Sequence, residues 1–184
     1  MTEPAQIPDQ AAREAAATTF DRNVVVIAGA GTGKTTLLVN RLLYLLMRRT
    51  DPLDLSRIVA LTFTNKAATE MKLRLRERLR SLVNVEGRDN PAAGSGTVSI
   101  ADLRMRYGWT TDEIVARADA ALRDVEKAQI GTLHSFAAHL LRLYPIEAGV
   151  TPTFQTDEDG SRFEEHFTSE WELWLDRELG PMGG

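Results

Sequence analysis

Apolar residues recur along the chain in two patterns, and together these predict strands that alternate with helices. Residues 23–28 (NVVVIA) and 57–63 (RIVALTF) are continuous apolar runs rich in β-branched residues, which is typical of fully buried strands. Each run precedes a stretch with apolar positions every three or four residues, 34–49 and 65–82, which predicts a helix. Two successive strand–helix units predict an α/β fold with a parallel sheet.

The rest of the chain reads as mostly helical. Residues 84–97, which contain GRDNPAAGSG, predict a surface loop. Four aromatic residues, Phe163, Phe167, Trp171 and Trp174, share one face of a late acidic helix. The other predicted elements are helices at 9–19, 111–127 and 132–144, the last ended by Pro145, and a short strand at 129–131.

Charge divides the chain into two parts. The net charge is -4, but up to Tyr144 there are 20 Lys and Arg against 16 Asp and Glu, a balance of +4, whereas the remainder has 2 against 10, a balance of -8. We therefore expect the N-terminal part of one domain over residues 1–160, with a loop and helical insertion at 84–127. An acidic helix at 161–184 would lead into a downstream region of a longer polypeptide.

The composition narrows the class of protein. There is no cysteine, which excludes disulfides, thiolate metal sites and cysteine nucleophiles. No stretch approaches the roughly 20 apolar residues of a membrane span, and the N-terminus lacks a basic region followed by an apolar block. We expect a soluble cytoplasmic protein with no membrane partner.

The strongest chemical signal is AGAGTGKT, Ala28–Thr35, which lies between the first predicted strand and its helix. Glycine at alternate positions lets backbone N–H groups converge on phosphate oxygens. Lys34 would reach the β- and γ-phosphates, and the Thr35 hydroxyl would ligate Mg²⁺. The first position is alanine instead of glycine, so the loop matches the relaxed form of the pattern.

Two further junctions carry polar residues at the end of a predicted strand. The first junction is LTFTNKAATEM, residues 61–71. Its hydroxyl, amide and ammonium groups could bind phosphates, and Phe63 could stack on a base. The favoured alternative is a helix cap with Phe63 in the core and a solvated basic helix. In IGTLHSF, residues 130–136, Thr132 could cap the helix and His134 could be a buried ring.

As an ordered set, AGAGTGKT, LTFTNKAATEM and IGTLHSF resemble the motifs of superfamily 1 DNA helicases of the UvrD/Rep/PcrA group. The phrase IGTLHSFAAHLLRLYPIEAGVTPTF, with the helical insertion before it, is most similar to the RecB/AddA branch. The resemblance covers roughly residues 9–160 and implies a RecA-like P-loop NTPase domain.

The resemblance also implies ligands, residue by residue. It implies that Gln10 reads the adenine, and that the partners are single-stranded DNA, further domains of the same polypeptide and helicase–nuclease subunits. The ATP-binding residues that it implies are Ala28, Gly29, Ala30, Gly31, Thr32, Gly33, Lys34, Thr35 and Thr36. The DNA-binding residues that it implies are Phe63, Thr64, Asn65, Lys66, Thr132, His134 and Ser135.

Part of the catalytic machinery of this group is not identifiable. ATP hydrolysis needs an Asp-Glu pair after an apolar strand and arginines from a second RecA-like domain. Residues 157–159 (DED) follow a polar, Pro-broken segment and predict a surface turn and helix start. His134 and His139 would face different sides of a helix, so they predict no metal site. We expect nucleotide binding with little ATPase activity and no unwinding; the alternatives are a small-molecule P-loop kinase and an ATP-gated DNA-binding module.

Overall fold

The structure is a computed structural model that describes residues 9–29, 31–50, 53–84, 97–157 and 160–180. The chain divides into two units, residues 1–136 and residues 137–184. Nearly all of the loop expected at 84–97 lies outside the described residues.

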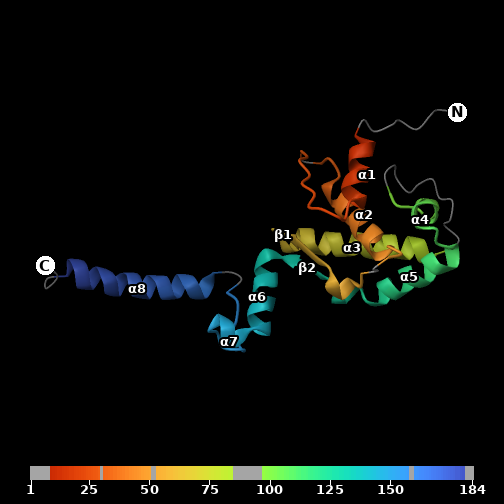
Figure 1. The fold of residues 1–184 in the computed structure, drawn as a ribbon. Coiled ribbons are helices and arrows are strands. Elements are labelled where there is room, and N and C mark those ends of the chain that lie inside the picture. The colour runs from red at the N-terminus through yellow and green to blue at the C-terminus, as the bar shows by residue number, and fades with distance from the viewer. Residues whose placement is uncertain (1–8, 30, 51–52, 85–96, 158–159, 181–184) are drawn as a thin grey trace. The chain divides into compact units, whose positions relative to one another are not determined.

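The first unit contains most of the predicted elements (Figure 1). The expected helices at 9–19, 34–49, 65–82 and 111–127 all form, within a few residues of the predicted ends. The elements are α1 (Gln10–Thr18), α2 (Lys34–Leu46), the 3-10 turn η1 (Leu55–Arg57), β1 (Val59–Thr62), α3 (Asn65–Val83), α4 (Ile100–Tyr107), α5 (Thr111–Arg123), the 3-10 turn η3 (Val125–Lys127), β2 (Gln129–Thr132) and the start of α6 (Leu133–Leu143).

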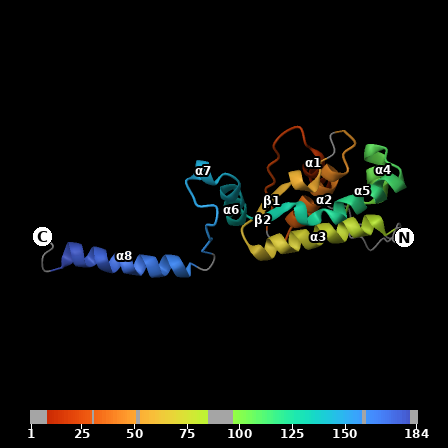
Figure 2. The ribbon, with the colours of Figure 1, turned by 90° about the horizontal axis from the view of Figure 1, so that it is seen from below.

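The sheet of the described residues is the parallel pair β1–β2, in register from Val59 opposite Gln129 to Thr62 opposite Thr132. Helices α3 and α5 lie side by side, and α3 also contacts both strands (Figure 2). Burial alternates along both strands, and Ile130, one of the more buried positions, is 6% exposed. The predicted α/β class with a parallel sheet is therefore confirmed.

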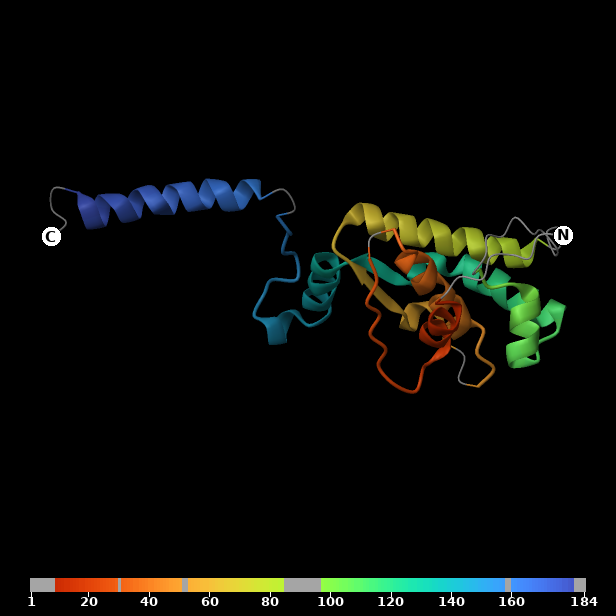
Figure 3. The ribbon, with the colours of Figure 1, turned by 90° about the horizontal axis from the view of Figure 1, so that it is seen from above.

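The strand predicted at residues 23–28 is wrong for this structure. The segment forms a loop, with Val25 85% and Ile27 96% exposed (Figure 3). A strand needs a neighbour that offers an unpaired edge, and no strand of the described residues pairs with this segment. The hydrophobic pattern reports a tendency to be buried and does not supply that edge.

The core of the first unit lies between α2, α3 and α5. Leu43 of α2, Leu75 and Leu79 of α3 and Ile114 of α5 have no exposed surface. The buried residues of each helix recur at three- or four-residue spacing, as Met71, Leu75, Leu79 and Leu82 do in α3, so each helix turns one apolar face inward. The packing fixes α2, whose N-terminus follows the glycine-rich loop, against α3, whose N-terminus follows β1.

The insertion is attached to the C-terminal end of α2. Three of its side chains donate hydrogen bonds to backbone carbonyls there: Tyr107 Oη to Tyr44 (3.2 Å), Trp109 Nε1 to Met47 (2.7 Å) and the Arg117 guanidinium to Leu46. The last carbonyls of a helix have no partner within the helix, so these contacts complete its end. Helices α4 and α5 each begin with a capping box, Ser99 with Asp102 and Thr110 with Glu113.

The second unit contains the rest of α6, the short α7 (Pro145–Ala148) and α8 (Ser161–Leu179). The four aromatic rings of α8 stack in a row, with centroids 6.0, 6.0 and 5.1 Å apart, as the helical spacing predicted. Asp157 accepts hydrogen bonds from the backbone N–H groups of Arg162 and Phe163, which confirms the predicted helix start for that residue. None of the helices described is long and apolar enough to cross a membrane.

Candidate nucleotide and nucleic-acid site

The loop before α2 has the backbone of an anion-binding turn. Gly31 and Gly33 adopt left-handed φ values of 72° and 84°, where a side chain would introduce strain. Gly33 is the N-cap of α2, and this residue makes no side-chain cap hydrogen bond to the first turn of the helix. The N-terminal N–H groups of a helix carry partial positive charge, so this end is suited to a phosphate.

Lys34 lies across the loop. Its Nζ donates hydrogen bonds to the carbonyls of Ala28 (3.0 Å) and Gly29 (2.5 Å), and the Thr32 hydroxyl donates to the Gly29 carbonyl (2.9 Å). The side chain is exposed, so the ammonium can exchange these carbonyls for phosphate oxygens. Thr35, the predicted Mg²⁺ ligand, is partly exposed in the first turn of α2. Ala30 lies outside the described residues.

Sequence reasoning missed Arg13, which ties α1 to the loop. Its guanidinium donates to the Thr32 carbonyl (2.8 Å) and to the Asp9 carboxylate (2.8 Å). The hydrogen bond between Arg13 and Asp9 lowers the pKa of Asp9 and raises the pKa of Arg13. The signal for Arg13 was its position one helical turn after Gln10, which places both residues on one face of α1.

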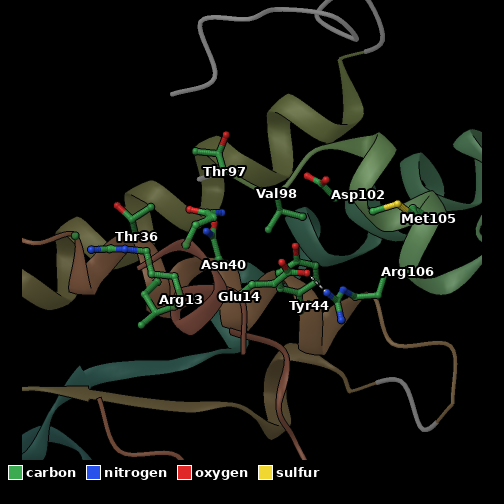
Figure 4. Close-up of a pocket in the computed structure, with 13 residues that line it drawn as sticks. Arg13, Glu14, Thr36, Asn40, Tyr44, Thr97, Val98, Asp102, Met105 and Arg106 are labelled. Atoms are coloured by element: carbon green, nitrogen blue, oxygen red, sulfur yellow. Dashed lines mark hydrogen bonds and ion pairs between the residues drawn. The ribbon is translucent and has the colours of Figure 1, made fainter. Parts of the chain in front are cut away.

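A pocket of about 440 Å³ opens beside the loop, between α1, α2 and α4 (Figure 4). Gln10 and Arg13 line it from α1, and Gly33, Thr36 and Asn40 line it from the loop and α2. The structure therefore brings Gln10, the predicted adenine-reading residue, to the same pocket as the end of the phosphate-binding loop. Its volume is in the range of small-molecule sites, roughly 300–1,000 Å³.

The basic face of α3 is only partly a solvated surface. Lys72 and Arg76 pair with Glu126, and Arg74 pairs with Glu70 at 2.5 Å, as expected for exposed charges. However, Arg74 and Arg78 also line a second pocket of about 280 Å³ together with Thr36 and Asn40. Two guanidinium groups of α3 thus lie near the first turns of α2, a proximity that the sequence pattern did not predict.

The carboxyl end of β1 has an ordered turn. The Thr62 hydroxyl donates to the Thr64 carbonyl at 2.9 Å and faces the Gly131 carbonyl of the neighbouring strand at 3.4 Å. The Thr64 hydroxyl accepts from the Ala67 N–H at 3.2 Å and caps α3, as the capping alternative predicted. Phe63 is 96% exposed, so the alternative that placed it in the core is wrong.

The carboxyl end of β2 is built in the same way. Thr132 is buried, its hydroxyl accepts from the Ser135 N–H (3.1 Å), and its carbonyl accepts from the Ser135 hydroxyl (2.8 Å). Thr132 therefore caps α6, which confirms the capping alternative. His134 is exposed, so the buried-ring alternative is wrong. Because Thr62 and Thr132 are register partners, the turns after the two strands are neighbours.

A glycine-rich turn at a helix N-terminus, together with polar turns at the ends of two parallel strands, defines an α/β domain of the P-loop class. The chain belongs to the UvrD/REP helicase N-terminal domain family, whose model matches residues 9–175. The family assignment confirms the predicted helicase group and leaves the small-molecule kinase alternative without support.

Curated relatives are similar to most of the chain. Proteins named as subunits of an ATP-dependent helicase/nuclease are 30% identical over 139 residues in Anoxybacillus flavithermus, 32% over 147 in Desulforudis audaxviator and 34% over 134 in Bacillus pumilus. The matches cover 76%, 80% and 73% of this chain but 9%, 10% and 9% of the relatives. The chain thus spans about a tenth of their length, and the similarity to these relatives agrees with the predicted RecB/AddA branch.

Proposed function

We propose that this chain is the ATP- and DNA-binding segment of an ATP-dependent DNA helicase that acts in the cytoplasm. The observation that carries the proposal is the start of α2, where Gly33 leaves the helix N-terminus without a side-chain cap and Lys34 presents its ammonium. Fixed N–H dipoles and a mobile positive charge at one point are the requirements for a polyphosphate.

In this proposal each loop residue has a distinct task. The backbone N–H groups of residues 29–36 bind phosphate oxygens, and Lys34 neutralises charge on the β- and γ-phosphates. The Thr35 hydroxyl would hold Mg²⁺, and the ion would supply positive charge at the phosphates. No group of three His, Cys, Asp or Glu side chains that could hold a metal ion is present in the described part of the chain. Gln10, on the shared pocket, reads the base.

Single-stranded DNA would bind at the turns that follow β1 and β2. Phe63, with almost its whole ring exposed, offers a face on which a base can stack. The exposed side chains of Asn65 and Lys66 and the start of α3 are suited to backbone phosphates. His134 and Ser135 would add contacts from α6, with Thr64 and Thr132 fixing the two turns.

By itself the chain is expected to bind nucleotide with little hydrolysis, because it offers no acidic pair after an apolar strand. The full-length polypeptide would provide that pair and the second RecA-like domain. The relatives are named as subunits of a helicase/nuclease, and this name supports DNA as the substrate and a partner subunit in the assembled protein.

Binding of a fluorescent ATP analogue to the purified chain tests the proposal. Lys34→Ala should abolish binding while the helical content is kept, because Lys34 is exposed and contributes no core packing. Lys127→Ala is the matched control, since Lys127 is also exposed and pairs with Asp124 on the surface. Equal affinity of the Lys34→Ala variant and the parent chain would disprove the role of the loop. Rapid DNA-stimulated hydrolysis by the chain would show that its active site is complete.

A further inference from the structure

We propose that helix α4 of the insertion forms the wall against which the nucleoside part of the nucleotide binds. This inference rests on the proposed binding of ATP and adds to it a second contact surface. The loop before α2 would hold the phosphates, and the insertion would hold the base.

The pocket between α1, α2 and α4 is continuous with the phosphate-binding end of α2. Gly33 and Thr36 line one end of the pocket, and its lining continues along α2 through Asn40 to Tyr44. A helix rises by about 1.5 Å per residue, so the lining extends roughly 10 Å from Gly33 to Asn40. This length is suited to a nucleoside whose phosphates lie at the N-terminus of α2. Figure 4 shows Asp102, Met105 and Arg106 of α4 on the side opposite Arg13 and Thr36.

The lining matches the surfaces of a purine base. Val98 and Tyr44 are each 8% exposed and provide an apolar floor, and Met105, which is 84% exposed, adds a thioether at the rim. An apolar floor of this kind is suited to the flat face of a purine base.

Helix α4 is held at this position by the elements that carry the loop. The Arg106 guanidinium pairs with Glu14 of α1 and lies over the Tyr44 ring, 5.4 Å from its centroid. The Tyr107 hydroxyl donates to the Tyr44 carbonyl, and the two rings meet edge to face at 6.4 Å. Contacts to both α1 and α2 mean that the wall keeps its distance from the phosphate site, as a base-binding surface requires.

Binding of three ligands separates this proposal from a purely structural role for α4. The ligands are ATP, ADP and inorganic tripolyphosphate, which lacks a nucleoside. Met105→Ala and Arg106→Ala should each lower the affinity for ATP and ADP roughly five- to tenfold. The first variant loses an apolar contact to the base, and the second loses the ion pair that positions α4. Both variants should bind tripolyphosphate as the parent chain does.

Arg104→Ala is the matched control, because Arg104 is an exposed residue of the same helix that does not line the pocket. It should leave all three affinities unchanged. Unchanged ATP affinity in both Met105→Ala and Arg106→Ala, or an equal loss for ATP and tripolyphosphate, would overturn the proposal. Failure of the proposed function looks different: the parent chain would then bind none of the three ligands, whereas Lys34→Ala should lose all three if the function is right.

Discussion

Gly131→Ala tests the turn that presents the proposed DNA contacts of α6. A Cβ added at Gly131 would lie 2.6 Å from the Ser135 Oγ and 3.8 Å from the Ser135 Cβ. The first distance is far inside van der Waals contact and the second is ordinary contact. The serine hydroxyl must therefore rotate and give up its hydrogen bond to the Thr132 carbonyl, whereas the rest of the side chain can stay.

The magnitude follows from three contributions. The lost hydrogen bond costs about 1 kcal/mol, and the displaced rotamer costs roughly 0.5–1.5 kcal/mol. Replacing a glycine that has an ordinary φ returns about 0.5–1 kcal/mol, because the unfolded chain becomes less flexible. Gly131→Ala should then destabilise the parent chain by about 1 kcal/mol. In a Ser135→Ala background the clash is absent, and the same change should stabilise by about 0.5 kcal/mol.

The assay is a double-mutant cycle in urea, with the free energy of unfolding measured for the parent chain, both single variants and the double variant. The expected coupling between Gly131 and Ser135 is roughly 1.5 kcal/mol. Affinity for a fluorescent oligothymidylate should fall in Gly131→Ala, because His134 and Ser135 follow the turn. Additive free energies would refute the placement of the Ser135 hydroxyl, and unchanged DNA affinity would refute the role of this turn in binding.

Two further predictions concern charge. Lys66→Ala should weaken single-stranded DNA binding and reduce the slope of log affinity against log salt by about 0.7, the value for one phosphate contact on a single strand; an unchanged slope would remove Lys66 from the interface. Backbone and hydroxyl hydrogen bonds from Thr110 lower the pKa of Glu113 below its ordinary value of 4.5, so its stabilising effect is present above pH 4.5 and is lost as pH falls through the lowered pKa. The melting temperature should drop over that acidic window, and Glu113→Gln should make the drop smaller; an identical pH profile for the two proteins would contradict the capping role.

The sequence determined the features that depend on neighbouring residues. The spacing of glycines at 29, 31 and 33 predicted the phosphate-binding turn, and the structure shows left-handed backbone at two of them. Helical periodicity predicted α2 and α3 within a few residues, because a helix closes its hydrogen bonds within its own segment. Thr64 and Thr132 were foreseen as caps, since a cap bonds to a backbone only three residues away.

Only the tertiary structure decided what depends on distant segments. The apolar run at 23–28 reads as a buried strand, but pairing depends on how a distant strand edge is placed, and neither strand of the described sheet pairs with this segment. The exposure of Phe63 and the meeting of Gln10 with Gly33 likewise depend on how separate elements pack. The position of α4 beside the loop follows from contacts across more than 60 residues, such as Tyr107 to Tyr44, and chain spacing cannot encode a contact made through packing.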